Sequence, residues 1–136
     1  MAAAQGARQE YRVPGQAEPI SHYTDAVRAG GLLFVSGVVP VDGEGRLVGA
    51  GDVAEQARQV FRNIASVLAA AGASFADVVK VVVFLTEIDD RTLINPVRQE
   101  VFGTVRPASS LVEVSALAVP GAKVEIECIA QLPAAG

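Results

Sequence analysis

The segment Val78–Leu85 constrains the fold of this chain more than any other, because it is a nearly unbroken run of β-branched and aromatic residues. It reads Val-Val-Lys-Val-Val-Val-Phe-Leu, with Lys80 as its one charged residue. A run this short and this rich in valine favours a strand over a helix. Because apolar and polar residues do not alternate in it, we expect both faces of the strand to be covered. Helical patterns precede and follow it, so we predict an α/β layer around this strand.

The composition predicts one domain with more apolar surface than its own core can bury. The chain has 136 residues; we expect residues 1–9 to be disordered and residues 10–136 to form a single domain. Hydrophobic residues make up 51% of the chain, yet no segment reaches the roughly 20 apolar residues that a membrane helix needs. The surplus predicts a subunit interface and therefore an oligomer.

Charge and residue inventory argue against several classes of function. The formal net charge is −4 and Trp is absent, whereas nucleic-acid binding needs a basic face and stacking rings. The single cysteine, Cys128, excludes an internal disulfide, and we expect it to be an inert core residue. One His and one Cys without metal-ligand spacing lead us to expect no metal and no cofactor. With no signal-peptide pattern, we expect a cytoplasmic protein with no membrane or nucleic-acid partner.

A hairpin is predicted in the first third of the chain. Gly30-Gly31 separates a strand expected over residues 23–29 from a second strand, Leu32–Val38, and tight turns need the positive φ that glycine allows. Within the second strand, Ser36-Gly37 predicts a bulge or a close approach of the backbone to another group.

Residues 52–71 carry the clearest helical pattern. Asp52 and Glu55 have the spacing of a capping box, and Gly72 is a natural C-terminal cap. Apolar residues recur at helical spacing and predict a buried stripe, formed by Ala57, Val60, Phe61, Ile64, Leu68 and Ala71. A helix that leads into the next strand predicts a crossover connection.

A second helix is expected within residues 89–102. Pro96 suits the first position of a helix, so we predict Asn95 as its N-cap. Residues 104–109 are expected to form a loop, and residues 110–116 a strand.

The alternation over residues 123–132 is the most regular in the chain and predicts the last strand. One set of side chains is expected to lie under the helices: Val124, Ile126, Cys128 and Ala130. The other set faces the opposite side: Glu125, Glu127, Ile129 and Gln131. If that side is the subunit interface, Glu125 and Glu127 would line polar pockets between chains. We therefore predict an α+β fold, a mixed sheet of about six strands with two helices on one face.

Several short motifs between about residue 23 and about residue 130 occur in an order and spacing that carry a resemblance. They are Ser36-Gly37, Glu55-Gln56, Asn63, Ala-Ala-Gly-Ala-Ser at 70–74, Asp-Val-Val-Lys at 77–80, Phe84-Leu85, Asn95, Pro107-Ala108 and Val-Glu-Ile-Glu at 124–127. Together they resemble the Rid family, also called the YjgF or L-PSP family. The resemblance implies a chorismate-mutase-like fold and a homotrimer with a small-molecule cleft between neighbouring subunits.

In the deaminase branch of this family, the substrates are small enamines or imines that carry a carboxylate. The resemblance implies substrate-binding roles for Tyr23, Ser36, Gly37 and Asn95. It implies a catalytic role for Glu125, which would help to activate the water that attacks the imine carbon. In the family an arginine directly after the Pro-Ala pair binds the carboxylate, which suits the paired donors of a guanidinium.

The chain departs from the family pattern at that arginine. The family's Pro-Ala-Arg-Ser reads Pro-Ala-Ser-Ser here, so Ser109 takes the place of the arginine, and the next variable position, often cysteine, is Leu111. Ser109 and Leu111 are therefore expected at the cleft. Serine carries no charge, and a lost charge-assisted hydrogen bond costs about 1.5–3 kcal/mol. Arg106 is expected among the substrate-binding residues as a replacement, with Arg98 as a second candidate.

Three functions stay open from the sequence. The first is a divergent Rid-type hydrolase or deaminase of small enamines and imines. The second is a non-catalytic trimer that binds a small metabolite in the same cleft, which Ser109 favours. The third, an endoribonuclease, comes from older family naming, and the acidic net charge argues against it. Structural interpretations also remain, with Asn95 as a helix cap, Glu125 as a solvated strand residue and Tyr23 as an interface residue.

Overall fold

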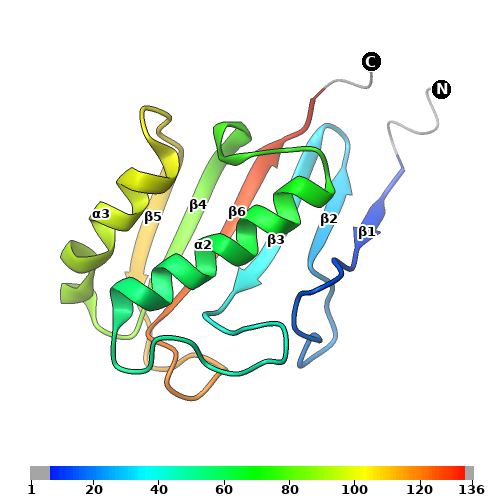
Figure 1. Ribbon diagram of the computed structural model, residues 1–136. Helices are drawn as coiled ribbons and strands as arrows, with labels where there is room; N and C mark the ends of the chain where they lie inside the picture. The colour runs from blue at the N-terminus through cyan, green and yellow to red at the C-terminus, as the bar shows by residue number, and fades with distance from the viewer. Residues whose placement is uncertain (1–6, 134–136) are drawn as a thin grey trace.

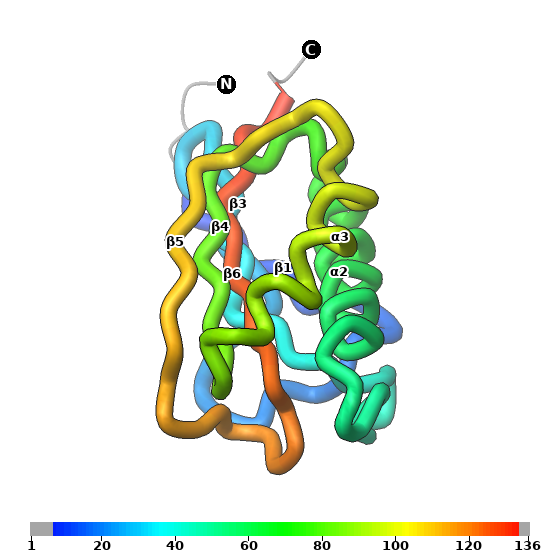
Figure 2. Tube along the Cα trace, turned by 90° about the vertical axis from the view of Figure 1, so that its left-hand side faces the viewer, coloured from blue at the N-terminus to red at the C-terminus, as the bar shows by residue number. Residues whose placement is uncertain are grey.

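The described chain, residues 7–133 of a computed structural model, folds into one mixed sheet with its α-helices on a single face (Figure 1). The strands are β1 Gln9–Tyr11, β2 Ala26–Ala29, β3 Leu32–Val38, β4 Val78–Leu85, β5 Ala108–Glu113 and β6 Val124–Gln131. The α-helices are α2 Val53–Ala70 and α3 Arg91–Phe102, and the 3-10 helices are η1 Phe75–Asp77 and η2 Ile88–Asp90. The sheet order is β1-β2-β3-β6-β4-β5, and Figure 2 shows α2 and α3 on the same side of it. The predicted α+β class is confirmed.

The hairpin and the bulge of the first strands form where the glycines predict them. β2 pairs with β3 in antiparallel fashion across Gly30-Gly31, and Gly30 has a φ of 60°. β2 begins at Ala26 rather than at residue 23, because the chain bends over residues 20–22 and the Tyr23 N–H donates locally to the Ser21 carbonyl instead of to a neighbouring strand. The register of β3 on β6 shifts between Val35 and Val38, which confirms the bulge.

Two crossovers place β4 inside the sheet. It pairs in parallel with β5 and in antiparallel fashion with β6, with α2 before it and α3 after it. Its buried side chains face the helices, and they are Val78, Val81, Val83 and Leu85. Within residues 7–133 the α-helices cover one face of β4, and cover of the opposite face by a second copy of the chain stays a prediction.

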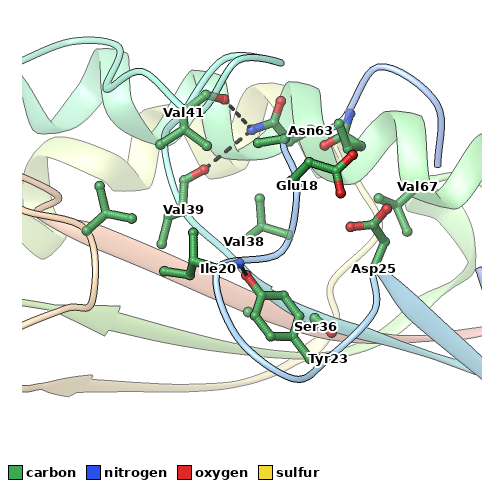
Figure 3. Close-up of a pocket in the computed structure, with 15 residues that line it drawn as sticks. Glu18, Ile20, Tyr23, Asp25, Ser36, Val38, Val39, Val41, Asn63 and Val67 are labelled. Carbon is green, nitrogen blue, oxygen red and sulfur yellow. Dashed lines mark hydrogen bonds between the residues drawn. The ribbon is translucent and has the colours of Figure 1, made fainter. Parts of the chain in front are cut away.

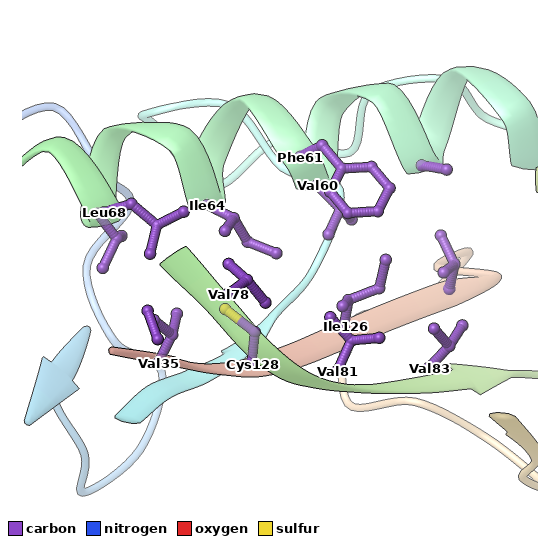
Figure 4. Packing of buried hydrophobic residues seen from close by; sticks show 14 of the residues in the cluster. Val35, Val60, Phe61, Ile64, Leu68, Val78, Val81, Val83, Ile126 and Cys128 are labelled. Atoms are coloured by element: carbon purple, nitrogen blue, oxygen red, sulfur yellow. The ribbon is translucent and has the colours of Figure 1, made fainter. Parts of the chain in front are cut away.

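Helix α2 packs its apolar stripe on β3, β4 and β6 (Figure 4). The Asp52 carboxylate accepts a hydrogen bond from the Glu55 N–H at 3.1 Å and so caps the helix. The reciprocal half of the predicted capping box is not formed, because the Glu55 carboxylate pairs with Arg62 and the Asp52 N–H donates to the Gly49 carbonyl. The buried residues are Val53, Gln56, Ala57, Val60, Phe61, Ile64, Val67 and Leu68, whereas Ala71 is only half-buried. Cys128 lies in this core, and burial, aided by the charge of Glu127, raises the pKa of its thiol to about 12.

One polar side chain, that of Gln56, is fully buried in this apolar layer. Its Nε2 donates to the carbonyls of Gly49 and Gly121, both at 3.1 Å, and its Oε1 accepts from the N–H of Lys123 at 2.7 Å. The amide therefore joins the first turn of α2 to two loops and to the start of β6, and it satisfies all of its hydrogen-bonding groups although its side chain is fully buried.

Three phenylalanines join the two helices. Phe61 of α2, Phe75 of η1 and Phe102 of α3 contact one another edge to face, with ring centroids 5.5–5.9 Å apart. This geometry is favourable for aromatic quadrupoles and adds to the energy of apolar burial. The cluster fixes the end of α3 against α2.

The predicted start of the second helix is wrong. α3 begins at Arg91, after η2, and Pro96 lies inside it, so Asn95 is an exposed residue within the helix and not its N-cap. Proline removes one helical hydrogen bond. Burial of Ile94 and Val97, which are 0% and 1% exposed, provides the compensating packing.

The predicted loop over residues 104–109 is also too long. Ala108 and Ser109 belong to β5, because they pair with Lys80 and Val81 of β4. The strand ends at Glu113 rather than at residue 116.

Of residues 1–9, predicted to be disordered, residues 1–6 lie outside the described part, and Gln9 begins β1. Neither α2 nor α3 has the length and apolarity to cross a bilayer, and the same holds for any helix of residues 7–133. The predicted cytoplasmic location stays a prediction.

Candidate functional site

Four of the predicted site residues line one cavity of about 400 Å³ beside the bulge of β3. These are Tyr23, Ser36, Gly37 and Glu125, and we call the cavity the glutamate pocket. Its remaining wall is mostly apolar and comes from Ile20, Ser21, Val39, Ala118 and Val119. No sequence pattern marks Ile20 or Val119 as pocket residues, since both lie in loops without regular periodicity.

The bulge brings the backbone of β3 against the carboxylate of β6. A Cβ built on Gly37 would collide with Glu125 Oε2 and lie 3.0 Å from Glu125 Cδ, so only glycine leaves that carboxylate in place. Ser36 is held by backbone contacts, because its Oγ donates to the Thr24 carbonyl and its N–H to the Asp25 carbonyl. The sequence-predicted close approach at Ser36-Gly37 is therefore an approach to Glu125.

Glu125 has the electrostatics of an acid–base group. It is half-buried on the face of β6 that points away from the helices, opposite Phe84 of β4. Burial raises the pKa of its carboxyl group, and the negative charge of Glu127 raises it further. No Lys or Arg of residues 7–133 forms a salt bridge with it. Such a carboxylate takes up a proton more readily than a solvated one.

A second, smaller cavity of about 100 Å³ adjoins the glutamate pocket (Figure 3). The two share six lining residues: Ile20, Tyr23, Ser36, Gly37, Val39 and Val119. Asn63 of α2 closes it, with Nδ2 donating to the carbonyls of Val41 at 2.9 Å and Val39 at 3.4 Å. Those bonds satisfy the amide, so Asn63 supports the wall of the cavity.

The other predicted residues line a separate cavity of about 550 Å³ between α3 and β5. Asn95, Arg98, Arg106 and Ser109 define what we call the arginine pocket. Arg98 Nη2 donates a hydrogen bond to Ser109 Oγ at 2.8 Å. Burial lowers the pKa of the Arg98 guanidinium, whereas Arg106 is exposed. Of the two arginines considered from the sequence, Arg98 is therefore the one that contacts Ser109.

Leu111 does not line either pocket. It lies in a neighbouring cavity with Arg91, Thr92, Asn95, Pro96 and Arg98, so it is next to the arginine pocket through Asn95 and Arg98.

Within one chain the two pockets are apart. Ser109 pairs with Val81, whose side chain is buried under the helices, whereas Glu125 pairs with Phe84, on the other face. β4 also lies between β5 and β6, which separates these strands by about 10 Å. The structure thus brings the predicted residues together as two groups and not as one. Within residues 7–133, no cluster of His, Cys, Asp and Glu side chains is suited to hold a metal ion.

Comparison with known proteins identifies the family. The family profile described as "Endoribonuclease L-PSP" matches residues 15–132. The chain belongs to the Rid (YjgF, L-PSP) family. A RutC family protein of Pyrococcus horikoshii is 42% identical over 113 residues, which cover 83% of this chain and 89% of that protein.

Solved structures of Rid-family proteins have the same fold. RidA of an Antarctic Psychrobacter has a TM-score of 0.85 and 34% identity, and covers 91% of this chain and 99% of its own. The YjgF gene product of E. coli has a TM-score of 0.82 and 32% identity, with 90% and 98% covered. The resemblance inferred from the motifs is confirmed at the level of family and fold.

Proposed function

We propose that this Rid-family protein hydrolyses small enamines or imines that carry a carboxylate, in clefts between subunits of a homotrimer. The observation that carries the proposal is the division of the candidate residues into two pockets of opposite charge. One pocket holds a half-buried carboxylate, Glu125, with a raised pKa, and the other holds a half-buried guanidinium, Arg98. A substrate with an imine at one end and a carboxylate at the other needs both the carboxylate and the guanidinium. Because the two pockets lie apart within one chain, a second copy of the chain would supply the missing group of each site.

The open face of the sheet supports association between copies. Large apolar side chains are exposed there, with Leu32 at 38%, Phe34 at 42% and Val112 at 43%. They come from β3 and β5, the strands that also contribute to the two pockets. Burying these side chains in an interface would be favourable, because apolar surface of this extent is costly to leave in water.

The proposed reaction needs water and one proton-transfer group. Glu125 accepts a proton from a water molecule as the water oxygen attacks the imine carbon and passes it to the nitrogen, which forms a carbon–oxygen bond and a neutral carbinolamine. Glu125 then takes the hydroxyl proton of the carbinolamine and gives it to the nitrogen, so that the carbon–nitrogen bond breaks, ammonia leaves and the carbonyl forms. The raised pKa of Glu125 suits both transfers, since an efficient acid–base group titrates close to the working pH.

Ser109 favours a second candidate, a trimer that binds a small carboxylate without catalysis. In that case the cleft would keep its ligand but lack the orientation that attack by water requires. An endoribonuclease, the function in the name of the matching family profile, is the third candidate. Cleavage of RNA that persists at high salt would support it, because non-specific electrostatic binding weakens as salt rises.

An imine-hydrolysis assay tests the proposal. An amino-acid oxidase generates the imine of a small amino acid in the presence of semicarbazide, and the protein should decrease the semicarbazone formed by hydrolysing the imine first. Analytical ultracentrifugation of the same sample should give a trimer. Hydrolysis equal to the buffer rate for a panel of such imines, with a trimer that still binds 2-oxo acids, would replace the proposal by the binding role.

A further inference from the structure

The Arg98 side chain contacts a neighbouring strand instead of extending into solvent. It lies on α3 and reaches across to β5, where its Nη2 meets Ser109 Oγ at 2.8 Å. Serine is short, so this contact directs the guanidinium toward the strand and the mouth of the arginine pocket. A guanidinium has five N–H donors. Of these, one is used by Ser109, which leaves a planar pair for a ligand.

The charge of Arg98 is not balanced by an acid. Among residues 7–133, no carboxylate lies within 4.0 Å of it, whereas Arg58 and Arg62 of α2 both pair with Glu55. Yet Arg98 is half-buried, and that burial lowers the pKa of its guanidinium. Taking a charge out of water costs free energy unless a partner is supplied. An anionic ligand would supply that partner.

The rest of the pocket suits an anion as well. Its lining contains two arginines, two amides and a hydroxyl, and it contains no Asp or Glu: Asn95, Arg98, Gln99, Phe102, Gly103, Val105, Arg106, Pro107 and Ser109. In a chain with a net charge of −4 this is a local reversal of sign. Phe102 and Val105 exclude water from one side, which strengthens the electrostatic interaction.

We propose that Arg98 binds the carboxylate of the ligand as a bidentate pair, with Ser109 Oγ holding the guanidinium in place and donating its hydroxyl hydrogen to the same carboxylate. The positive charge of this site therefore comes from helix α3 and not from β5. This inference rests on the proposed function for the identity of the ligand as a carboxylate, but it concerns binding and not hydrolysis.

Titration with a charged and an uncharged ligand of the same shape separates the effect of the Arg98 charge on affinity from the effect of its packing. The probes are pyruvate, the 2-oxo acid that hydrolysis of the corresponding imine yields, and pyruvamide, which has the same shape without the charge. NMR shift titrations of the full chain give the Kd of each. Arg98→Gln should weaken pyruvate about tenfold or more and leave pyruvamide unchanged, because one charge-assisted pair is lost. Arg98→Lys, which keeps the charge but not the planar fork, should bind with intermediate strength.

Matched variants control for net charge and folding. Arg62→Gln removes the same charge from the exposed side of α2 and should leave the Kd of pyruvate unchanged. The double variant Arg98→Gln with Ser109→Arg moves the guanidinium from the helix to the strand and should restore binding of pyruvate. Restored binding would also show that Arg98→Gln itself does not unfold the pocket.

Two results would overturn the inference: equal pyruvate affinity in wild type and Arg98→Gln, or loss of affinity in Arg106→Gln alone. Imine hydrolysis is read separately. Hydrolysis that survives in Arg98→Gln at wild-type efficiency contradicts the role of Arg98 and leaves the proposed function standing. Pyruvate binding that depends on Arg98 in a protein without hydrolysis supports the inference and contradicts the proposed function.

Discussion

The glutamate pocket and the arginine pocket are built in different ways. In the first, backbone geometry sets the position of the functional group, because a bulge and a glycine bring β3 against Glu125. In the second, two side chains from separate elements meet, Arg98 from α3 and Ser109 from β5. The first pocket is acidic and the second is basic. In the proposed site, the proton-transfer group would therefore depend on the register of the sheet, whereas the anion-binding group would depend on how helix α3 packs beside β5.

The largest effect is expected from Glu125→Gln. The amide cannot take a proton from water, so imine hydrolysis should fall about 10²–10⁴-fold. Binding of pyruvate in the arginine pocket should stay within about twofold of wild type, since Arg98 is untouched. Steady-state rates and NMR titrations check the two halves of this prediction. Glu127→Gln is the matched control and should keep most of the activity; a similar loss in both variants would contradict the assignment.

Gln56→Ala should have the next largest effect, on stability. It removes the partner of the Gly121 carbonyl and of the Lys123 N–H, whereas the Gly49 carbonyl still accepts from the Asp52 N–H, and a polar group that loses its partner costs about 1–3 kcal/mol when shielded from water. We expect the free energy of unfolding, measured in urea, to fall by about 2–4 kcal/mol. Gln59→Ala, one turn along the same helix and half-buried, should cost less than about 1 kcal/mol. Equal losses would show that burial of the amide is not what matters.

Gly37→Ala should lower activity while the fold is kept. The added methyl group occupies the position of the Glu125 carboxylate, which must rotate away. A misplaced catalytic group costs about ten- to a hundredfold in rate. Gly31→Ala in the hairpin is the control, because a Cβ there meets nothing within 4 Å. Thermal unfolding should show both variants folded, and full activity in Gly37→Ala would contradict the close approach.

The smallest effect is expected from Glu127→Gln on the pH profile. Burial, and then the charge of Glu127, raises the pKa of Glu125 above the ordinary value. Removing that charge lowers the pKa, so the ionised base persists to lower pH. The acid limb of kcat/KM should therefore shift to lower pH in Glu127→Gln. A shift to higher pH, or none, would mean that the limb reports another group.

Short sequence patterns predicted the fold and also some residues of the glutamate pocket. The Ser36-Gly37 dipeptide predicted the bulge, and alternation along β6 predicted that Glu125 faces away from the helices. Both features depend on backbone geometry, which short sequence patterns encode. Asn95 was misplaced because the preference of Asn-Pro for a helix start gave way to burial of Ile94 and Val97.

The contact between Arg98 and Ser109 lay beyond sequence reasoning. The two residues are brought together by the parallel pairing of β5 with β4 and by the packing of α3 on the sheet. The residue pattern predicts a loop at Ser109, whereas the structure places it in β5 opposite Val81. A side-chain contact of this kind follows from tertiary packing, for which one sequence carries no pattern.

The phenylalanine cluster has a consequence for how the protein responds to heat. Phe102 belongs both to the edge-to-face cluster and to the wall of the arginine pocket, one helical turn from Arg98. If the packing between α2 and α3 loosens, the position of Arg98 on α3 should therefore change, whereas Glu125 is held by the strand pairing of β6 with β4. On warming, the affinity for a carboxylate ligand should fall at temperatures well below that of unfolding. Conversely, a bound carboxylate should stabilise the packing of α3 against α2.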